Sequence, residues 1–252
     1  MPKDQQRADL RGADLRGADL READLQRARL GEADLQRADL QEADLRGADL
    51  READLRWANL READLRWVEL QEADLRVADL ERANLCNAEL RHADLRFAYL
   101  WEANLEGVNL QQTNLRWAKL RGTNLRQTNL QGTDLRDSDL RNADLRETHL
   151  RDTDLQEADL EGALVGNGSG TTVISHHSSY GLSPHGHTMH CFVTVDGDWC
   201  IIYGCRQKTL AEARKHWHPD NYSNVPELFV AHRRDIVDWT NRMLDRLETH
   251  AE

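Results

Sequence analysis

The sequence predicts an all-β solenoid followed by a small α+β unit, and three observations support this division. Leucine occupies every fifth position from Leu10 to Leu160. A small residue, usually alanine, stands two positions before each of these leucines. After Leu160 the repeat stops and the composition changes, because nine of the eleven histidines and three of the four cysteines lie there. We therefore expect a repeat domain at 1–165, an irregular linker at 166–187 and a small α+β domain or cap at 188–252.

The five-residue period excludes both an α-helix and a flat strand. Each step of five residues in a helix rotates the side chain by about 140°, so the leucines would form no stripe. Side chains in a strand alternate between two faces, so leucines five residues apart would point to opposite sides. The small residue and the leucine of each unit point inward together only if the chain turns a corner at the two variable residues after the leucine. Such a chain winds into a β-helix, and the leucines form its core rather than a functional site.

The repeated unit A-D/N-L-x-x resembles the repeat of the pentapeptide repeat family, and the resemblance covers residues 8–162. It implies a right-handed quadrilateral β-helix with four pentapeptides in each coil, which gives about eight coils. The resemblance does not extend to the C-terminal residues, which we assign to no known family.

The composition narrows the classes of function. The chain has 252 residues and a formal net charge of −12, which argues against a general binder of nucleic acids or anionic membranes. No apolar segment approaches the roughly 18 residues of a membrane-spanning helix. The first residues, MPKDQQRADL, lack the apolar core of a signal peptide, so we expect a cytoplasmic protein. We find no phosphate-binding loop and no dinucleotide-binding fingerprint, and we expect no cofactor.

Apolar side chains recur at one surface position of four consecutive coils, at Trp57, Val77, Phe97 and Trp117, because residues 20 apart stack on one face. Exposed aromatic clusters of this kind usually mark an interface. Three interpretations remain open: the side chains cover the backbone by stacking on each other, the C-terminal region or a second subunit docks on them, or a distinct partner does. The predicted partner-binding residues are Trp57, Val77, Phe97, Tyr99, Trp101, Trp117, Arg116, Lys119 and Arg121.

Charged residues are unevenly distributed along the repeats. Residues 107–133 contain four basic side chains, including Arg126, and no acidic one, so they form a basic belt. Over all 31 units, Asp precedes the leucine in 18 and Arg follows it in 18, which predicts an interleaved, neutralising pattern. Acidic columns nevertheless remain on single faces. They are Asp14, Asp34, Asp54, Asp74 and Asp94, and Glu22, Glu42 and Glu62.

The C-terminal residues predict a hairpin followed by two helices. Two apolar segments within 188–207 flank the turn sequence Asp196-Gly197-Asp198. Helices are expected at about 210–218 and 226–248 from a capping box and from helical spacing of apolar residues. Histidine and cysteine are zinc-ligand types, but neither a CxxC nor an HxxxH spacing is present. The weak metal-ligand candidates are His185, His187, His190 and Cys205.

These observations support three hypotheses about function. The first is a non-enzymatic scaffold that presents the aromatic column to an unknown protein partner, and a homodimer is an open alternative. The second, implied by the family resemblance, is a DNA mimic that binds DNA gyrase or topoisomerase IV and protects it from inhibitors. The basic belt interrupts the continuous anionic surface that mimicry needs. The third is a metal-binding or enzymatic C-terminal unit, with the repeats as a spacer.

Overall fold

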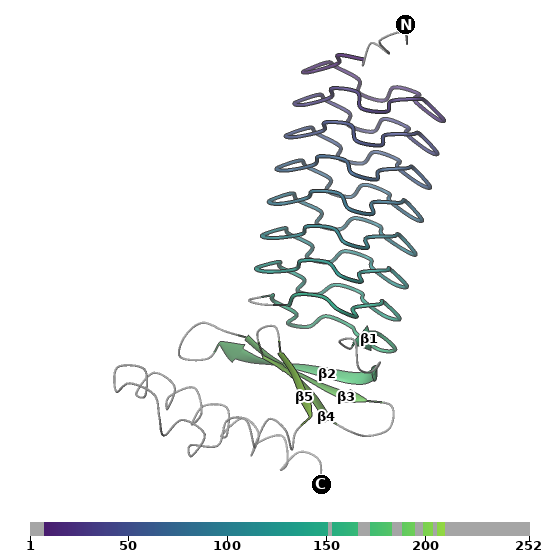
Figure 1. Cartoon of the computed structure of the whole chain (residues 1–252). Helices are drawn as coiled ribbons and strands as arrows, with labels where there is room; N and C mark the ends of the chain where they lie inside the picture. Colours follow the sequence, from purple (N-terminus) through teal and green to yellow (C-terminus); the bar gives the residue numbers. More distant parts are fainter. Residues whose placement is uncertain are drawn as a thin grey trace, which may run out of the picture.

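The structure is a computed structural model that describes residues 8–150 and 153–165, together with the backbone of four further strands. The strands beyond the repeats are β2 (Thr172–Leu182), β3 (Thr188–Thr194), β4 (Trp199–Tyr203) and β5 (Arg206–Thr209). Figure 1 shows a stack of flat coils with the sheet below its last coil.

Parallel bridges between residues 20 apart hold the coils together. Asp34 bridges Asp14 on one side and Asp54 on the other, and the same pattern runs from Asp9 to Leu164. Around each bridge the backbone N–H groups donate to the neighbouring coils, as from Leu15 to the Asp34 carbonyl at 2.8 Å. Twenty residues, or four pentapeptides, therefore make one coil, as the resemblance to the repeat family implies.

Every pentapeptide ends in a tight turn. The alanine after each turn donates to the leucine carbonyl before it, as from Ala13 to Leu10 at 3.1 Å. The second turn residue has a positive φ at every described turn, from 55° at Arg27 to 72° at Gly162. Its N–H donates to the next coil, as from Trp57 to the Arg76 carbonyl at 3.1 Å. These hydrogen bonds on both sides of the turn hold most kinds of side chain in a backbone conformation that usually favours glycine.

Leucine and alanine fill the inside of the coils. The leucines from Leu25 to Leu160 are buried, whereas Leu10, Leu15 and Leu20 of the first coil are only partly buried. Toward the C-terminal end, threonine replaces several core alanines without leaving a hydroxyl unpaired. The Thr123 hydroxyl, for example, donates to the Leu100 carbonyl of the preceding coil at 2.8 Å. The core is therefore apolar and filled by side chains, as expected.

The last coil continues into a five-stranded antiparallel sheet with the order β1-β2-β3-β4-β5. Strand β1 (Leu164–Val165) belongs to both parts of the fold. Leu164 makes a parallel bridge to Asp144 in the coil before it and pairs with Val173 of β2. The pairing with β2 therefore covers the backbone edge of the last coil at this strand.

The sheet corrects one expectation and supports another. Residues 166–187 were expected to be irregular, whereas 172–182 form β2. This strand pairs with β1 and β3, and the pairing satisfies its backbone N–H and C=O groups. Its sequence shows no clear alternation of polar and apolar residues. Strands β3 and β4 form the antiparallel pair expected for the hairpin at 188–207. The expected helices at 210–218 and 226–248 lie outside the described residues.

We predict that Leu75→Ala destabilises the coils by about 2–5 kcal/mol, because Leu75 is fully buried between neighbouring coils and its loss leaves a cavity. Leu15→Ala is the matched control, since Leu15 in the first coil is only partly buried and should cost clearly less. Urea unfolding followed by circular dichroism measures both variants. Equal losses would contradict a core that is tighter in the middle of the stack than at its start.

Candidate interaction surface

Four apolar side chains share one corner of four consecutive coils, and we call Trp57, Val77, Phe97 and Trp117 the aromatic corner. Each is the second residue of its turn, and its N–H donates to the next coil along the chain, so the four levels follow one another along the stack. The Phe97 and Trp117 rings stack with centroids 4.9 Å apart and an interplanar angle of 8°. Trp57 is 59% exposed and Phe97 47%, whereas Val77 and Trp117 are half-buried. The structure therefore brings the predicted residues together on the surface.

The backbone at this corner is costly for its side chains. Val77 has a φ of 61°, and a β-branched residue is a genuine outlier in this region. Other corners carry glycine or asparagine at this position, such as Gly47 and Asn87, which tolerate it better. Glutamate and arginine also occupy this position at many corners, as at Glu42 and Arg37, so Val77 is unusual because it is β-branched and not because of its φ alone.

Two more aromatic side chains lie on the adjoining face. Tyr99 and Trp101 meet edge to face, with centroids 5.6 Å apart and an interplanar angle of 77°. Both are exposed, and the backbone of Tyr99 bridges that of Lys119 in the next coil. Arg121 follows at the turn position above Trp101. An exposed aromatic pair therefore adjoins the basic belt, as the sequence predicts.

The basic side chains near the aromatic corner differ in how they are engaged. The Arg116 guanidinium lies 4.1 Å from the centre of the Trp117 ring, which is a cation–π contact, and 3.6 Å from the Asp137 carboxylate. Among the described residues, neither Lys119 nor Arg121 makes an ion pair. Arg116 therefore supports the aromatic corner, and the other two cations are available to a partner.

Trp67 was missed by the sequence analysis. It is 56% exposed at a different corner, with the Arg66 guanidinium 5.5 Å from its ring centre. Its neighbours at the same corner are Gly47 and Asn87, so it belongs to no apolar column. The signal was present in the sequence, because Trp67 occupies the same place in its pentapeptide as Trp57.

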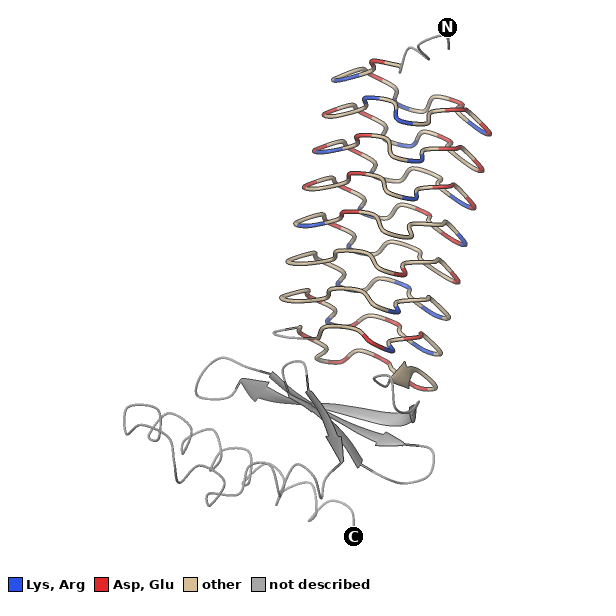
Figure 2. Cartoon of the chain, in the orientation of Figure 1, with Lys and Arg blue, Asp and Glu red and all other residues tan. Residues whose placement is uncertain are grey.

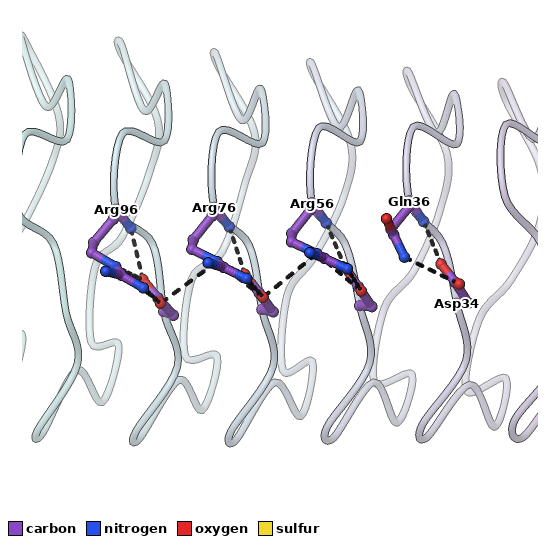
Figure 3. A network of polar contacts seen from close by, with 8 residues as sticks. Asp34, Gln36, Arg56, Arg76 and Arg96 are labelled. Carbon is purple, nitrogen blue, oxygen red and sulfur yellow. Dashed lines mark hydrogen bonds and ion pairs between the residues drawn. The ribbon is translucent and has the colours of Figure 1, made fainter.

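The aspartates before the leucines are paired with arginine wherever the unit reads Asp-Leu-Arg. In one such unit, Arg56 Nε donates to Asp54 Oδ1 at 2.8 Å and Nη2 donates to Oδ2 at 2.5 Å. The same guanidinium lies 3.6 Å from Asp74 of the next coil. Figure 3 shows the resulting alternation of carboxylate and guanidinium from coil to coil. Where the next coil carries an aspartate at the same position, the arginine thus separates two carboxylates that would otherwise repel.

This pairing changes the interpretation of the two acidic columns. Asp14, Asp54, Asp74 and Asp94 each form such a fork with their own arginine, and Asp34 accepts from Gln36 instead. Glu22, Glu42 and Glu62, at another corner, are exposed and make no ion pair among the described residues. Figure 2 shows basic and acidic positions interleaved over the coils. Of the two predicted columns, the glutamates are the ones that present exposed negative charge without an ion pair among the described residues.

Two forks at the start of the repeats lower the pKa of their carboxylates. The hydrogen bond from the Arg16 side chain lowers the pKa of Asp14 to about 2, and that from Arg21 lowers the pKa of Asp19 to about 2. The pKa values of Arg16 and Arg21 are raised, because the neighbouring carboxylate stabilises the charged guanidinium. Both members of each pair therefore remain charged at neutral pH.

The described residues offer no clustered metal ligands. No group of three or more His, Cys, Asp or Glu side chains among them could hold a metal ion. Of the metal candidates, His185, His187 and Cys205 lie outside the described residues, and only the backbone of His190 is described, in β3. The thiol of Cys86 is free and half-buried, and burial raises its pKa. In the same part of the chain, no helix is long and apolar enough to cross a membrane.

The repeats decide the family. The family model described as pentapeptide repeats matches in eight copies, over residues 6–41, 28–66, 38–76, 63–96, 88–127 and 128–164. The chain belongs to the pentapeptide repeat family. Members of this family are right-handed quadrilateral β-helices, as the resemblance implied. The 20-residue coils of this chain agree with that fold. No curated protein sequence compared with the chain matches it.

Solved structures similar to this pentapeptide repeat protein include other members of the family. HetL, described as involved in heterocyst differentiation regulation in Nostoc sp. PCC 7120, is 32% identical over 63% of this chain and 90% of HetL, with a TM-score of 0.30. QnrB1, described as a plasmid-mediated fluoroquinolone resistance protein, is 21% identical over 58% of this chain and 76% of QnrB1, with a TM-score of 0.39. Rfr23 from Cyanothece 51142 is 32% identical over 36% of this chain and 58% of Rfr23, with a TM-score of 0.25.

We predict that acid destabilises the repeat domain between about pH 4 and about pH 2. The folded pKa of Asp14 and Asp19 lies below the usual aspartate value of about 3.9, so the unfolded chain binds more protons in this window. Their contribution is present above pH 4 and is lost as the pH falls through 2. Thermal unfolding at a series of pH values measures the effect. The Asp14→Asn/Asp19→Asn variant should show a shallower dependence, and an unchanged slope would contradict the assignment.

We also predict that Val77→Asn stabilises the repeat domain by about 1 kcal/mol, because asparagine tolerates a positive φ better than valine. The reciprocal change, Asn87→Val, has the same place in its turn with a φ of 59° and should destabilise by a similar amount. Urea midpoints of the two variants test the pair. A loss of stability in Val77→Asn would show that folding itself requires the valine.

Proposed function

We propose that this pentapeptide repeat protein is a non-enzymatic scaffold that binds a macromolecular partner through the aromatic corner and the adjoining Tyr99–Trp101 face. The observation that carries the proposal is the row of apolar side chains along one corner of the coils, in which Trp57 and Phe97 are exposed and Phe97 stacks on the half-buried Trp117. Contiguous exposed apolar side chains are uncommon on soluble proteins unless they bind something. Tryptophan, tyrosine and arginine are also the residues most often found at the centres of interfaces.

The interior and the charged surface of the repeats both favour a binding role over catalysis. Leucine and alanine fill the coils, so the described repeats enclose no space for a substrate. Their aspartates stand in ladders beside arginines rather than as isolated pairs in a cleft. A carboxylate already engaged by one or two guanidinium groups is poorly placed to exchange a proton with a substrate.

DNA mimicry remains the alternative, and one observation favours it: the exposed, unpaired column Glu22, Glu42 and Glu62. The description of QnrB1 as a fluoroquinolone resistance protein suggests the corresponding assay. A DNA mimic needs a continuous anionic surface, whereas the aspartate column is neutralised by its arginines. For this reason we favour the scaffold. Inhibition or drug protection of DNA gyrase, lost when the three glutamates become glutamines, would reverse this preference.

We predict that Trp57→Asn/Phe97→Asn/Trp117→Asn loses partner binding while the coils remain folded. Asparagine is polar and tolerates the positive φ of these positions, so the substitutions remove the apolar surface without straining the turns. Removing aromatic side chains from the centre of an interface typically costs about 2 kcal/mol or more for each important residue. Quantitative affinity capture from cell extract, using the full-length wild type and the variant, measures the loss.

Trp67→Asn is the matched control for this experiment. Trp67 has nearly the same exposure as Trp57 and the same place in its turn, but it lies outside the aromatic corner. Partners that bind the corner should be retained by Trp67→Asn and lost from the triple variant. Capture of the same proteins by all three chains would contradict the proposal.

A further inference from the structure

We propose that the aromatic corner is a two-fold interface on which a second copy of this chain packs antiparallel. This inference rests on the proposed role of the corner in binding and identifies its occupant. The decisive observation is the order of residues along the corner, which is Arg37, Trp57, Val77, Phe97, Trp117 and Asp137. The four apolar levels are thus flanked by a cation at one end and an anion at the other.

A two-fold axis can be placed perpendicular to the stack, midway between Val77 and Phe97. The second copy then runs along the corner in the opposite direction. Trp57 of one copy then faces Trp117 of the other, and Val77 faces Phe97. Arg37 faces Asp137. Each contact occurs twice, as in any interface in which both copies use the same patch. All apolar levels meet apolar levels, and both charged levels meet their opposites.

The equal spacing of the coils allows all of these pairs of levels to face each other at once. Every step from one level of the corner to the next is made by the same backbone hydrogen bond. It runs from Trp57 to Arg76 at 3.1 Å, from Val77 to Arg96 at 3.0 Å and from Phe97 to Arg116 at 3.1 Å. Uniform steps mean that two copies aligned at the centre are also aligned at Arg37 and Asp137.

Other arrangements of two copies are less favourable. A parallel pair would set Arg37 against Arg37 and Asp137 against Asp137, and like charges in an interface are repulsive. An antiparallel pair shifted by one coil in one direction places Arg37 opposite Trp117. Shifted in the other direction it places Arg37 opposite Glu157 but sets Asp137 against Trp57, so only the centred pairing matches both Arg37 and Asp137 with opposite charges. The charged levels therefore specify both the direction and the register.

The two charges are available for this role. Arg37 is exposed and makes no ion pair among the described residues. The Asp137 side chain is 36% exposed and has one ion pair, with Arg116 at 3.6 Å. A carboxylate accepts several hydrogen bonds, so a second guanidinium can join the first. Arg37 would then complete a group in which one aspartate joins two arginines beside Trp117.

The test is the oligomeric state of the full-length chain as a function of concentration. A corner-to-corner contact is narrow and belongs with weak interfaces, so sedimentation velocity should cover about 1 µM to about 1 mM. We expect a reversible dimer. Arg37→Asp and Asp137→Arg should each weaken it about tenfold or more, because each places like charges together, and the double exchange should restore it. Arg27→Asp is the matched control, since Arg27 is an exposed arginine with a φ of 55° at another corner.

The outcomes separate this inference from the proposed function. Loss of the dimer in Arg37→Asp and its recovery in the double exchange support the two-fold interface. A wild-type chain that stays monomeric overturns the inference, and the capture experiment with the triple asparagine variant then shows whether the corner still binds another protein. A dimer that is unchanged by Arg37→Asp and by Trp57→Asn also overturns it, since such a dimer uses another surface.

Discussion

The hydrogen bonds between residues 20 apart are the constraint on which the rest of this molecule depends. Each described coil donates to and accepts from its neighbours, so the chain must return to the same place after every fourth pentapeptide. The positive φ at each corner follows from this requirement, because the chain has only two residues in which to turn. Inside, the same requirement leaves room for one leucine and one small residue in each unit.

Stacking also brings equivalent surface side chains of neighbouring coils close together. Side chains at equivalent positions lie one above another, so a repeated aspartate brings like charges close together. The Asp-Leu-Arg unit answers this locally, because the arginine two residues on reaches both its own aspartate and the one in the next coil. With charge repulsion removed in this way, the corner positions are free to differ, and the aromatic corner, the unpaired glutamates and the basic belt all lie at or beside such positions.

The sequence predicts the part of the fold in which every residue has an equivalent 20 positions away. The leucine core and the turns follow from the five-residue period, and the alignment of Trp57 with Phe97 follows from the four units per coil that the family resemblance implies. Features without such an equivalent are not predicted. Strand β2 is an example, because it forms by pairing with Leu164 and Val165 and its polar sequence gives little sign of a strand. The interleaving of Asp and Arg is predicted as a pattern, but its bidentate geometry required side-chain coordinates. Trp67 was overlooked because it belongs to no apolar column.

The 20-residue coil also bears on how such a protein can change length during evolution. Gene segments that encode near-identical repeats recombine out of register, and a gain or loss of one whole coil leaves every remaining hydrogen bond and core leucine with an equivalent partner. The gain or loss of one whole coil therefore leaves the pattern of contacts needed for folding intact. The surface does change, because removing a coil between Trp57 and Trp117 shortens the aromatic corner and brings Arg37 and Asp137 one step closer. Selection on the length of this protein thus acts on what its corners present rather than on whether it folds.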